Sequence, residues 1–172
     1  IASILPISLS NLITYLIFGS SYFDKQLNLR NITMGYGREY ILLDQTKIID
    51  YSSNQFLLFD ENETSKEAVK KFQKFKTTEG YFIDKNKKFI GKLKLINVIN
   101  KKEKAIKFIE TKPIILKPDT SVLKAIKILE NFVGENIPII DKEKNISGVI
   151  SENDVLKAYS EISKSISSTE RN

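Results

Sequence analysis

The sequence predicts a mixed α/β protein in which two copies of one β-α-β-β-α unit follow a single transmembrane helix. Three observations predict it. Segments 56–100 and 113–157 align without a gap at a constant offset of 57 residues. Both segments alternate short apolar runs with amphipathic stretches in the same order. Residues 1–23 contain no charged side chain. Two such units usually complete one core together, so we expect the copies to act as a pair.

Identical residues in the two copies fall mainly on turns and on apolar faces. The matched pairs include Ala68 and Ala125, Lys70 and Lys127, Phe75 and Phe132, Asp84 and Asp141, Lys85 and Lys142, Lys87 and Lys144, Gly91 and Gly148, and Val98 and Val155. Overall identity between the copies is low, yet their apolar residues fall at equivalent positions throughout. The repeat therefore predicts the same chain path twice.

Each copy is expected to open with a strand, followed by polar residues that favour a helix start. These residues end at Thr64 and Ser121, and apolar positions at helical spacing follow them. Two strands joined by a polar turn come next, and a short helix begins near Lys94 or Ser151. Strands are expected at 56–59, 81–83 and 89–93, and at 114–116, 138–140 and 146–150. A further helix at 102–109 leads into the second copy.

Composition excludes several classes of chemistry. The 172 residues include no cysteine and no histidine, which removes disulfides, thiolate metal sites and the usual general base. We therefore predict that the protein is not an enzyme. The net charge is +6, but the aromatic-plus-arginine pattern of RNA-binding modules is missing, so no nucleic-acid partner is expected.

The uncharged stretch at 1–23 is long enough to cross most of a hydrocarbon layer about 30 Å thick. The alternative is a buried helix of a soluble protein. Lys25, Arg30 and Arg38 follow the stretch, and positive charge beyond a membrane helix favours the cytoplasmic side. We expect an integral membrane protein whose repeats lie in the cytoplasm.

The order of elements, with a glycine in the third strand, resembles the cystathionine-β-synthase (CBS) domain, and two in tandem resemble a Bateman module. The family pattern of Gly, two residues, Ser or Thr, two residues and Asp is matched by Gly148, Ser151 and Asp154. The first copy departs from it, with Lys94 and Asn97 in the last two places. The resemblance implies a membrane part at 1–23, a linker at 24–40, CBS domains at 41–101 and 102–162, and a polar tail at 163–172.

The resemblance also implies one nucleotide site in the second copy, formed by Ser151, Asn153 and Asp154. No cofactor is expected, and ATP, ADP or AMP would act as a regulatory ligand. A hydroxyl at a helix start can hold phosphate beside free N–H groups, and a carboxylate can accept ribose hydroxyls. An equally weighted alternative is structural, with Ser151 as a helix cap and Asp154 as a first-turn acid.

The front end resembles the last membrane helix of CLC chloride channels and transporters. That family carries a Ser-x-Tyr-Asp-x-x-Leu type segment whose tyrosine contacts chloride. Residues 21–27 read SYFDKQL. They differ from the family segment in that Ser21 directly precedes Tyr22 and Phe23 stands between Tyr22 and Asp24. The resemblance implies that Tyr22 binds chloride; the alternative is an interfacial aromatic anchor.

The resulting expectation is the last helix and regulatory region of a homodimeric voltage-gated chloride channel or proton/chloride antiporter. The alternative is the CBS pair of another membrane transporter, or a stand-alone CBS regulatory protein. Channel and antiporter are not separated by these residues.

Overall fold

The computed structural model describes residues 37–169, and the chain divides into two units, 1–41 and 42–172. The described part of the first unit is the beginning of helix α3 (Gly37–Gln45). The membrane helix expected at 1–23, and Tyr22 with it, lie outside the described residues. Among the helices between positions 37 and 169, none combines the length and the apolar character needed to cross a membrane.

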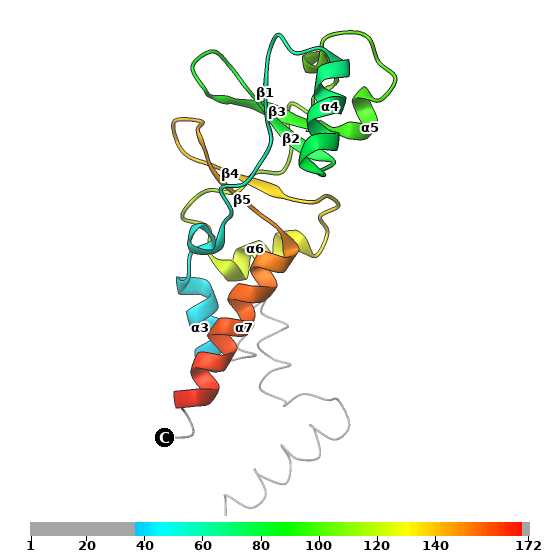
Figure 1. Ribbon diagram of the computed structural model, residues 1–172. Coiled ribbons are helices and arrows are strands. Elements are labelled where there is room, and N and C mark those ends of the chain that lie inside the picture. The colour runs from blue at the N-terminus through cyan, green and yellow to red at the C-terminus, as the bar shows by residue number, and fades with distance from the viewer. Residues whose placement is uncertain (1–36, 170–172) are drawn as a thin grey trace, which may run out of the picture. The chain divides into compact units, whose positions relative to one another are not determined.

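The first copy folds as a three-stranded sheet with helices against it (Figure 1). Its elements are β1 (Leu58–Asp60), α4 (Ser65–Phe75), β2 (Glu79–Ile83), β3 (Phe89–Lys94) and α5 (Leu95–Val98). Strand β1 pairs parallel to β2, and β2 pairs antiparallel to β3. Phe59, Phe72 and Phe82 are buried and in ring contact, so aromatic packing forms the centre of this core.

The second copy contains α6 (Val122–Leu129), the hairpin of β4 (Ile137–Ile140) and β5 (Ile146–Ile150), and the long helix α7 (Glu152–Thr169). Ile137, Ile139 and Ile150 are fully buried in its core. The helix starts and hairpins are as predicted, but the prediction that the second copy closes with a short helix is wrong, because α7 is 18 residues long. Thr64 and Ser121 cap α4 and α6 through hydrogen bonds from the backbone N–H three residues on.

The strand predicted at 114–116 is wrong, because only an isolated parallel bridge between Leu116 and Ile139 forms there. In the first copy the equivalent ladder includes a bond from the N–H of Tyr81 to the carbonyl of Leu57 (2.9 Å). The residue equivalent to Tyr81 is Pro138, which has no N–H to donate. The strand predicted at 56–59 is shifted and begins at Leu58.

The helix predicted at 102–109 is also wrong, since only a 3-10 turn, η2 (Ala105–Phe108), forms there. The backbone of this segment is bonded to the first copy instead. Ser65 N–H donates to the carbonyl of Glu103, and Ala105 N–H donates to the carbonyl of Glu63, both at 2.9 Å. Groups committed to long-range bonds cannot complete an α-helical ladder.

The segments that precede the two copies are exchanged between them. We call residues 46–53, which include the 3-10 turn η1 (Ile48–Tyr51), leader 1, and residues 103–110 leader 2. Leader 1 bridges the second copy and leader 2 bridges the first, through pairs that repeat at the offset of 57. These bridges are Lys47 to Ser121 and Ser53 to Val149, and Lys104 to Thr64 and Glu110 to Lys92. Each copy therefore needs the other's leader to close its core: Ile48 is buried in the second core and Ala105 in the first.

The repeated glycine allows this close approach. A Cβ at Gly91 would lie 2.6 Å from the carbonyl oxygen of Glu110 in leader 2, and a Cβ at Gly148 would lie 2.7 Å from the hydroxyl of Ser52 in leader 1. Both distances are shorter than van der Waals contact, so an added side chain would displace the backbone of leader 2 at Gly91 and the Ser52 side chain of leader 1 at Gly148. The glycine in the sequence motif thus serves the exchange of leaders.

Candidate functional site

The junction of β5 and α7 brings two of the predicted site residues into direct contact. Asp154 Oδ2 accepts hydrogen bonds from the N–H (2.8 Å) and the hydroxyl (2.6 Å) of Ser151, and Ser151 Oγ accepts from the N–H of Asp154 (3.2 Å). Both side chains are half-buried, whereas Asn153 is exposed. This is a reciprocal capping arrangement at the start of an 18-residue helix.

The same arrangement occurs at the start of α4, where Thr64 and Glu67 exchange equivalent bonds of 2.8–3.3 Å. These backbone and hydroxyl bonds from Thr64 lower the pKa of Glu67. The contacts at Ser151 are therefore sufficient for a structural role. What separates the two sites is their surroundings, because Ser151 directly follows a buried strand that leader 1 bridges at Val149.

At the equivalent junction of the first copy, Lys94 and Asn97 make no such pair. Lys94 is the N-cap residue of α5 without a capping side-chain bond, and the amide of Asn97 donates a long bond to the carbonyl of Phe108 (3.4 Å). A shallow cavity of about 380 Å³ opens here, with Lys94 in its wall; its other lining residues are Thr78, Glu79, Leu95, Ile96 and Ile99.

A buried ion pair lies beside this cavity and joins the two copies. Lys92 Nζ lies 2.6 Å from Glu79 Oε2, and their side chains are 2% and 5% exposed. Lys92 also donates to the carbonyl of Asn136 (3.0 Å), and Glu79 accepts from the backbone N–H groups of Glu135 (2.9 Å) and Asn136 (3.2 Å). The loop between α6 and β4 is thereby fixed to the first copy.

Glu135 completes this connection from the other side. Its carboxylate accepts hydrogen bonds from the hydroxyls of Thr77 (2.7 Å) and Thr78 (2.6 Å) and from the N–H of Thr78 (3.1 Å). Partial burial alone would raise the pKa of Glu135, but these bonds outweigh it and lower the pKa. Sequence reasoning missed the whole network, and its one local signal was a lysine, Lys92, between the apolar residues of β3.

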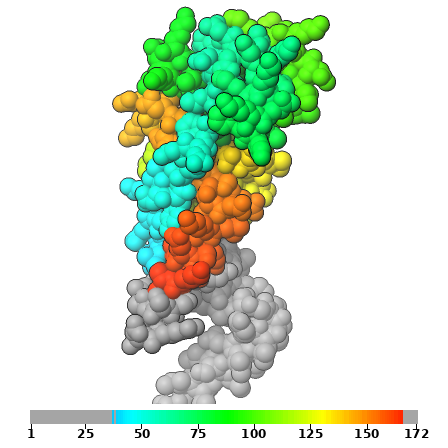
Figure 2. All heavy atoms as spheres, viewed as in Figure 1, coloured from blue at the N-terminus to red at the C-terminus, as the bar shows by residue number. Residues whose placement is uncertain are grey.

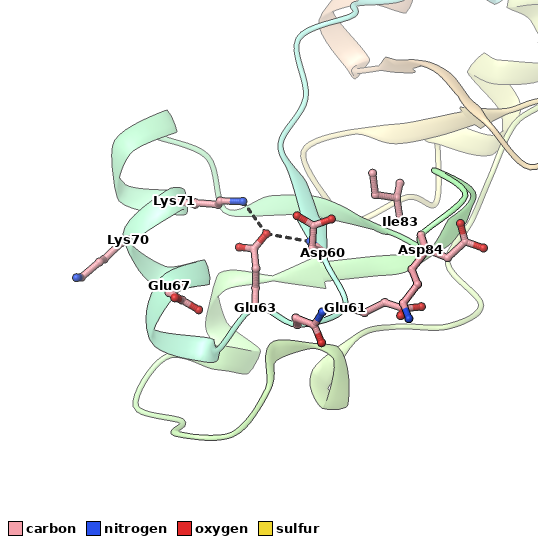
Figure 3. A pocket seen from close by; sticks show the side chains of 10 residues that line it. Asp60, Glu61, Glu63, Glu67, Lys70, Lys71, Ile83 and Asp84 are labelled. Atoms are coloured by element: carbon pink, nitrogen blue, oxygen red, sulfur yellow. Dashed lines mark hydrogen bonds and ion pairs between the residues drawn. The ribbon is translucent and has the colours of Figure 1, made fainter.

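A larger cavity of about 650 Å³ lies between α4 and the edge of the first sheet (Figure 3). Glu63 points into it and forms an ion pair with Lys71 (2.6 Å), while its Oε1 also accepts the N–H of Asp60 (2.9 Å). Lys70, one residue before Lys71, also lines the cavity, but its side chain points away from Glu63. Between positions 37 and 169, no cluster of three or more acidic side chains has an arrangement that could hold a metal ion.

The comparisons with known proteins agree with this architecture. A family model described as "CBS domain" matches residues 105–161, which include Gly148, Ser151 and Asp154. Solved structures extend the likeness over both copies. The CBS-pair protein CBSX2 from Arabidopsis thaliana is 14% identical, with 70% of this chain and 98% of that chain covered and a TM-score of 0.62.

The fold is a CBS-domain pair. The CBS pair of a proposed Mg²⁺ transporter from Shewanella oneidensis is similar over 90% of this chain and 92% of its own, at 18% identity and a TM-score of 0.59. The cytosolic domain of the Mg²⁺ channel MgtE, solved with ATP, is similar over 60% of this chain and 44% of its own, at 17% identity and a TM-score of 0.55. CBSX2 has also been solved with AMP. No curated protein matched the chain.

Proposed function

We propose that this CBS pair is a non-enzymatic regulatory module that binds an adenine nucleotide at the β5–α7 junction. The observation that carries the proposal is the position of the Ser151–Asp154 pair, which directly follows a buried strand bridged by leader 1 and lies within the segment that matches the family model. The AMP and ATP bound to CBSX2 and MgtE support the ligand class.

The geometry defines how a nucleotide would be held. Asp154 Oδ2 is occupied by Ser151, but Oδ1 accepts no hydrogen bond from a described residue. Ribose hydroxyls would donate to Oδ1, as in other nucleotide sites. The Ser151 hydroxyl would turn from Asp154 toward phosphate, beside the N–H groups of the first turn of α7. The exposed Asn153 lies between them in the same turn.

Leader 1 gives the bound nucleotide a route to the rest of the chain. Its residue Ser53 exchanges two backbone hydrogen bonds with Val149 (2.8 and 2.9 Å), two residues before Ser151. The leader continues along the chain into α3. A ligand that favours one arrangement of the junction would therefore bias the segment upstream, and the upstream segment would change nucleotide affinity by the same factor.

Equilibrium titration of the chain with ATP, ADP and AMP tests the site. Asp154→Asn and Ser151→Ala should each weaken binding at least tenfold, because each removes a direct ligand contact. Thr64→Ala is the matched control, since it removes an equivalent cap from α4 and should cost a similar stability, about 1 kcal/mol, without changing affinity. Equal affinity in all four proteins would refute the assignment and leave Ser151 as a cap.

A second and more specific candidate is supported by residues 1–27 alone. Their uncharged stretch and the SYFDKQL segment support the last membrane helix and cytoplasmic regulatory region of a homodimeric CLC-type chloride channel or proton/chloride antiporter, with Tyr22 at the anion. A phenolic hydroxyl can replace part of the hydration shell of chloride without a full charge. The test is chloride flux in the full-length protein with Tyr22→Phe, and unaltered rate and selectivity would count against this role.

Other transporters are the alternative setting for the same module. The similarity to the Mg²⁺ channel MgtE and to the Shewanella transporter supports a CBS pair attached to a transporter of another family. Any sequence that precedes residue 1 would distinguish the settings. Glycine-rich anion-binding helix starts and a gating glutamate there would favour the CLC setting.

A further inference from the structure

The charge of the chain is distributed unequally between the two copies. Positions 57–110 contain fourteen lysines and eight acidic residues, whereas positions 111–165 contain eight of each. Leader 2, with four of its eight residues charged, is bonded to the first copy. The positive excess of the protein is therefore concentrated in the first copy in space as well as in sequence.

The outer face of α4 carries a row of lysines. Lys66, Lys70 and Lys74 recur every four residues, which places them on one side of a helix, and all three are exposed. None of them forms an ion pair with a described residue, whereas Lys71 turns toward Glu63. Figure 3 shows Lys71 bonded to Glu63 and Lys70 pointing away from it. In Figure 2 the first copy is visible on the near face of the molecule.

Leader 2 extends the row at the start of α4. Lys104 bridges Thr64 in the backbone and its Nζ lies 3.1 Å from Asn62 Oδ1, and the neighbouring Lys102 is exposed. We call Lys66, Lys70, Lys74, Lys102 and Lys104 the basic face. Among the nearby acids, Glu67 and Glu103 accept backbone hydrogen bonds that lower their pKa values. Asp60, Glu61 and Glu63 line the same cavity as Lys70, and Glu63 is paired with Lys71. The five lysines of the face outnumber Glu67 and Glu103, the acids that alternate with them along α4 and leader 2.

Four of the five equivalent positions of the second copy do not hold lysine, and only Lys127, the equivalent of Lys70, keeps the charge. The residues 57 positions after Lys66, Lys74 and Lys104 are Leu123, Asn131 and Glu161. The basic face is thus a property of the first copy and not of the repeat.

We propose that the basic face docks on an anionic phospholipid surface. Charge complementarity carries the proposal: a helix face of exposed ammonium groups is attracted to acidic headgroups. Phe75 follows the row and is 59% exposed, so its ring can enter the headgroup region. The absence of arginine from positions 57–110 disfavours nucleic acid, whose recognition relies on planar guanidinium groups.

The proposal rests in part on the membrane attachment proposed for residues 1–23, which would hold the module near a bilayer. Each lysine near an anionic surface strengthens association about fivefold. Neutralising the three lysines of the α4 row should therefore lower the ratio of docked to undocked module about 100-fold. The attraction should also disappear at 1 M salt, where the screening length falls to about 3 Å.

The chain lacks cysteine, so a single fluorophore can be attached at a chosen position. Gln73→Cys places it within the α4 row, and Glu130→Cys places it at the equivalent, exposed position of the second copy. The full chain is reconstituted into vesicles of phosphatidylcholine alone or with one third phosphatidylserine, and energy transfer to labelled headgroups is measured. Transfer from position 73 should rise in the anionic vesicles, while transfer from position 130 should not.

Lys66→Gln, Lys70→Gln and Lys74→Gln together should abolish this rise. The charge-matched control replaces Lys124, Lys127 and Lys157 of the second copy, all exposed, and should leave it intact. An equal loss in both triple variants would overturn the proposal in favour of general charge attraction, and so would binding of a short RNA without any effect of phosphatidylserine. Failure of the chain to incorporate into either vesicle would instead refute the membrane attachment.

Discussion

The buried ion pair of Lys92 and Glu79 should be the polar contact whose loss destabilises the CBS-domain pair most. Replacing Glu79 by Gln keeps an oxygen for the N–H groups of the α6–β4 loop but removes the charge that compensates Lys92. That ammonium would then keep the carbonyl of Asn136 and the ring of Phe132, whose centroid is 5.1 Å away, and the more distant charge of Glu135 as its favourable neighbours. Breaking a buried pair in this way costs about 3–5 kcal/mol, a large part of the 5–15 kcal/mol that stabilises a typical domain.

Urea unfolding of the full chain, followed by circular dichroism, measures this cost as a lower midpoint at unchanged slope. Adding Lys92→Met to Glu79→Gln removes the stranded charge, and the double variant should recover about 2 kcal/mol of the loss. Glu143→Gln is the control, because Glu143 pairs with Lys88 at 3.9 Å and is 79% exposed; its effect should stay below about 0.5 kcal/mol. Single-variant costs below about 1 kcal/mol, or strict additivity, would refute the reasoning.

Three further predictions concern pH and backbone geometry. Burial, followed by the charges of nearby acids, raises the pKa of Tyr81, so its contribution to stability is complete below pH 10 and is lost as pH rises through the folded pKa; Tyr81→Phe should flatten the fall in unfolding free energy above pH 10. Gly91→Ala should cost about 2–3 kcal/mol and Gly148→Ala less, since the first clash is with backbone and the second with a side chain. Lys87→Gly and Lys144→Gly should each raise the unfolding free energy by about 1 kcal/mol, and with it the urea midpoint, because both residues have a left-handed backbone with φ of 63° and 65°.

Each of these has its own check. Titration followed by tyrosinate absorbance should show one fewer tyrosine with a raised pKa in the Tyr81→Phe protein. An unchanged fall of the unfolding free energy above pH 10 would contradict the prediction. For the glycines, equal losses of unfolding free energy in Gly91→Ala and Gly148→Ala would contradict the prediction, because they would mean that the backbone of leader 2 moves as easily as the Ser52 side chain. Lys85→Gly, which is not at a left-handed position, is the control for the turns and should destabilise through chain entropy.

Local chemistry explains which elements could be predicted from the sequence. Caps such as Thr64 and turn residues such as Asp84 act within four residues; Asp84 accepts hydrogen bonds from the N–H groups of Asn86 and Lys88, both at 2.8 Å. Such features predict α4 and the hairpins well. The proximity of Ser151 and Asp154 could be predicted for the same reason, since they lie in one helical turn.

The elements that could not be predicted depend on distant partners. The strand expected at 114–116 is reduced to a bridge by Pro138, and the helix expected at 102–109 loses its ladder to bonds with residues 63–65. Nothing in the sequence marks Lys92 as the partner of Glu79. The exchange of leaders is likewise invisible to a search for repeats, because the offset of 57 is the same whether a leader packs on its own copy or on the other.

The exchange gives the two junctions different connections, and this difference bears on function. Leader 1 bonds to β5 next to Ser151 and continues upstream into α3. Leader 2 bonds to Lys92 on β3, next to Lys94, and continues only into the second copy. A rearrangement at the second junction thus has a short backbone route through leader 1 toward α3, whereas one at the first junction reaches leader 1 only through β2 and β1. A pair that regulates an upstream segment gains most from a ligand at the second junction, and that junction is the one with the Ser and Asp of the family pattern.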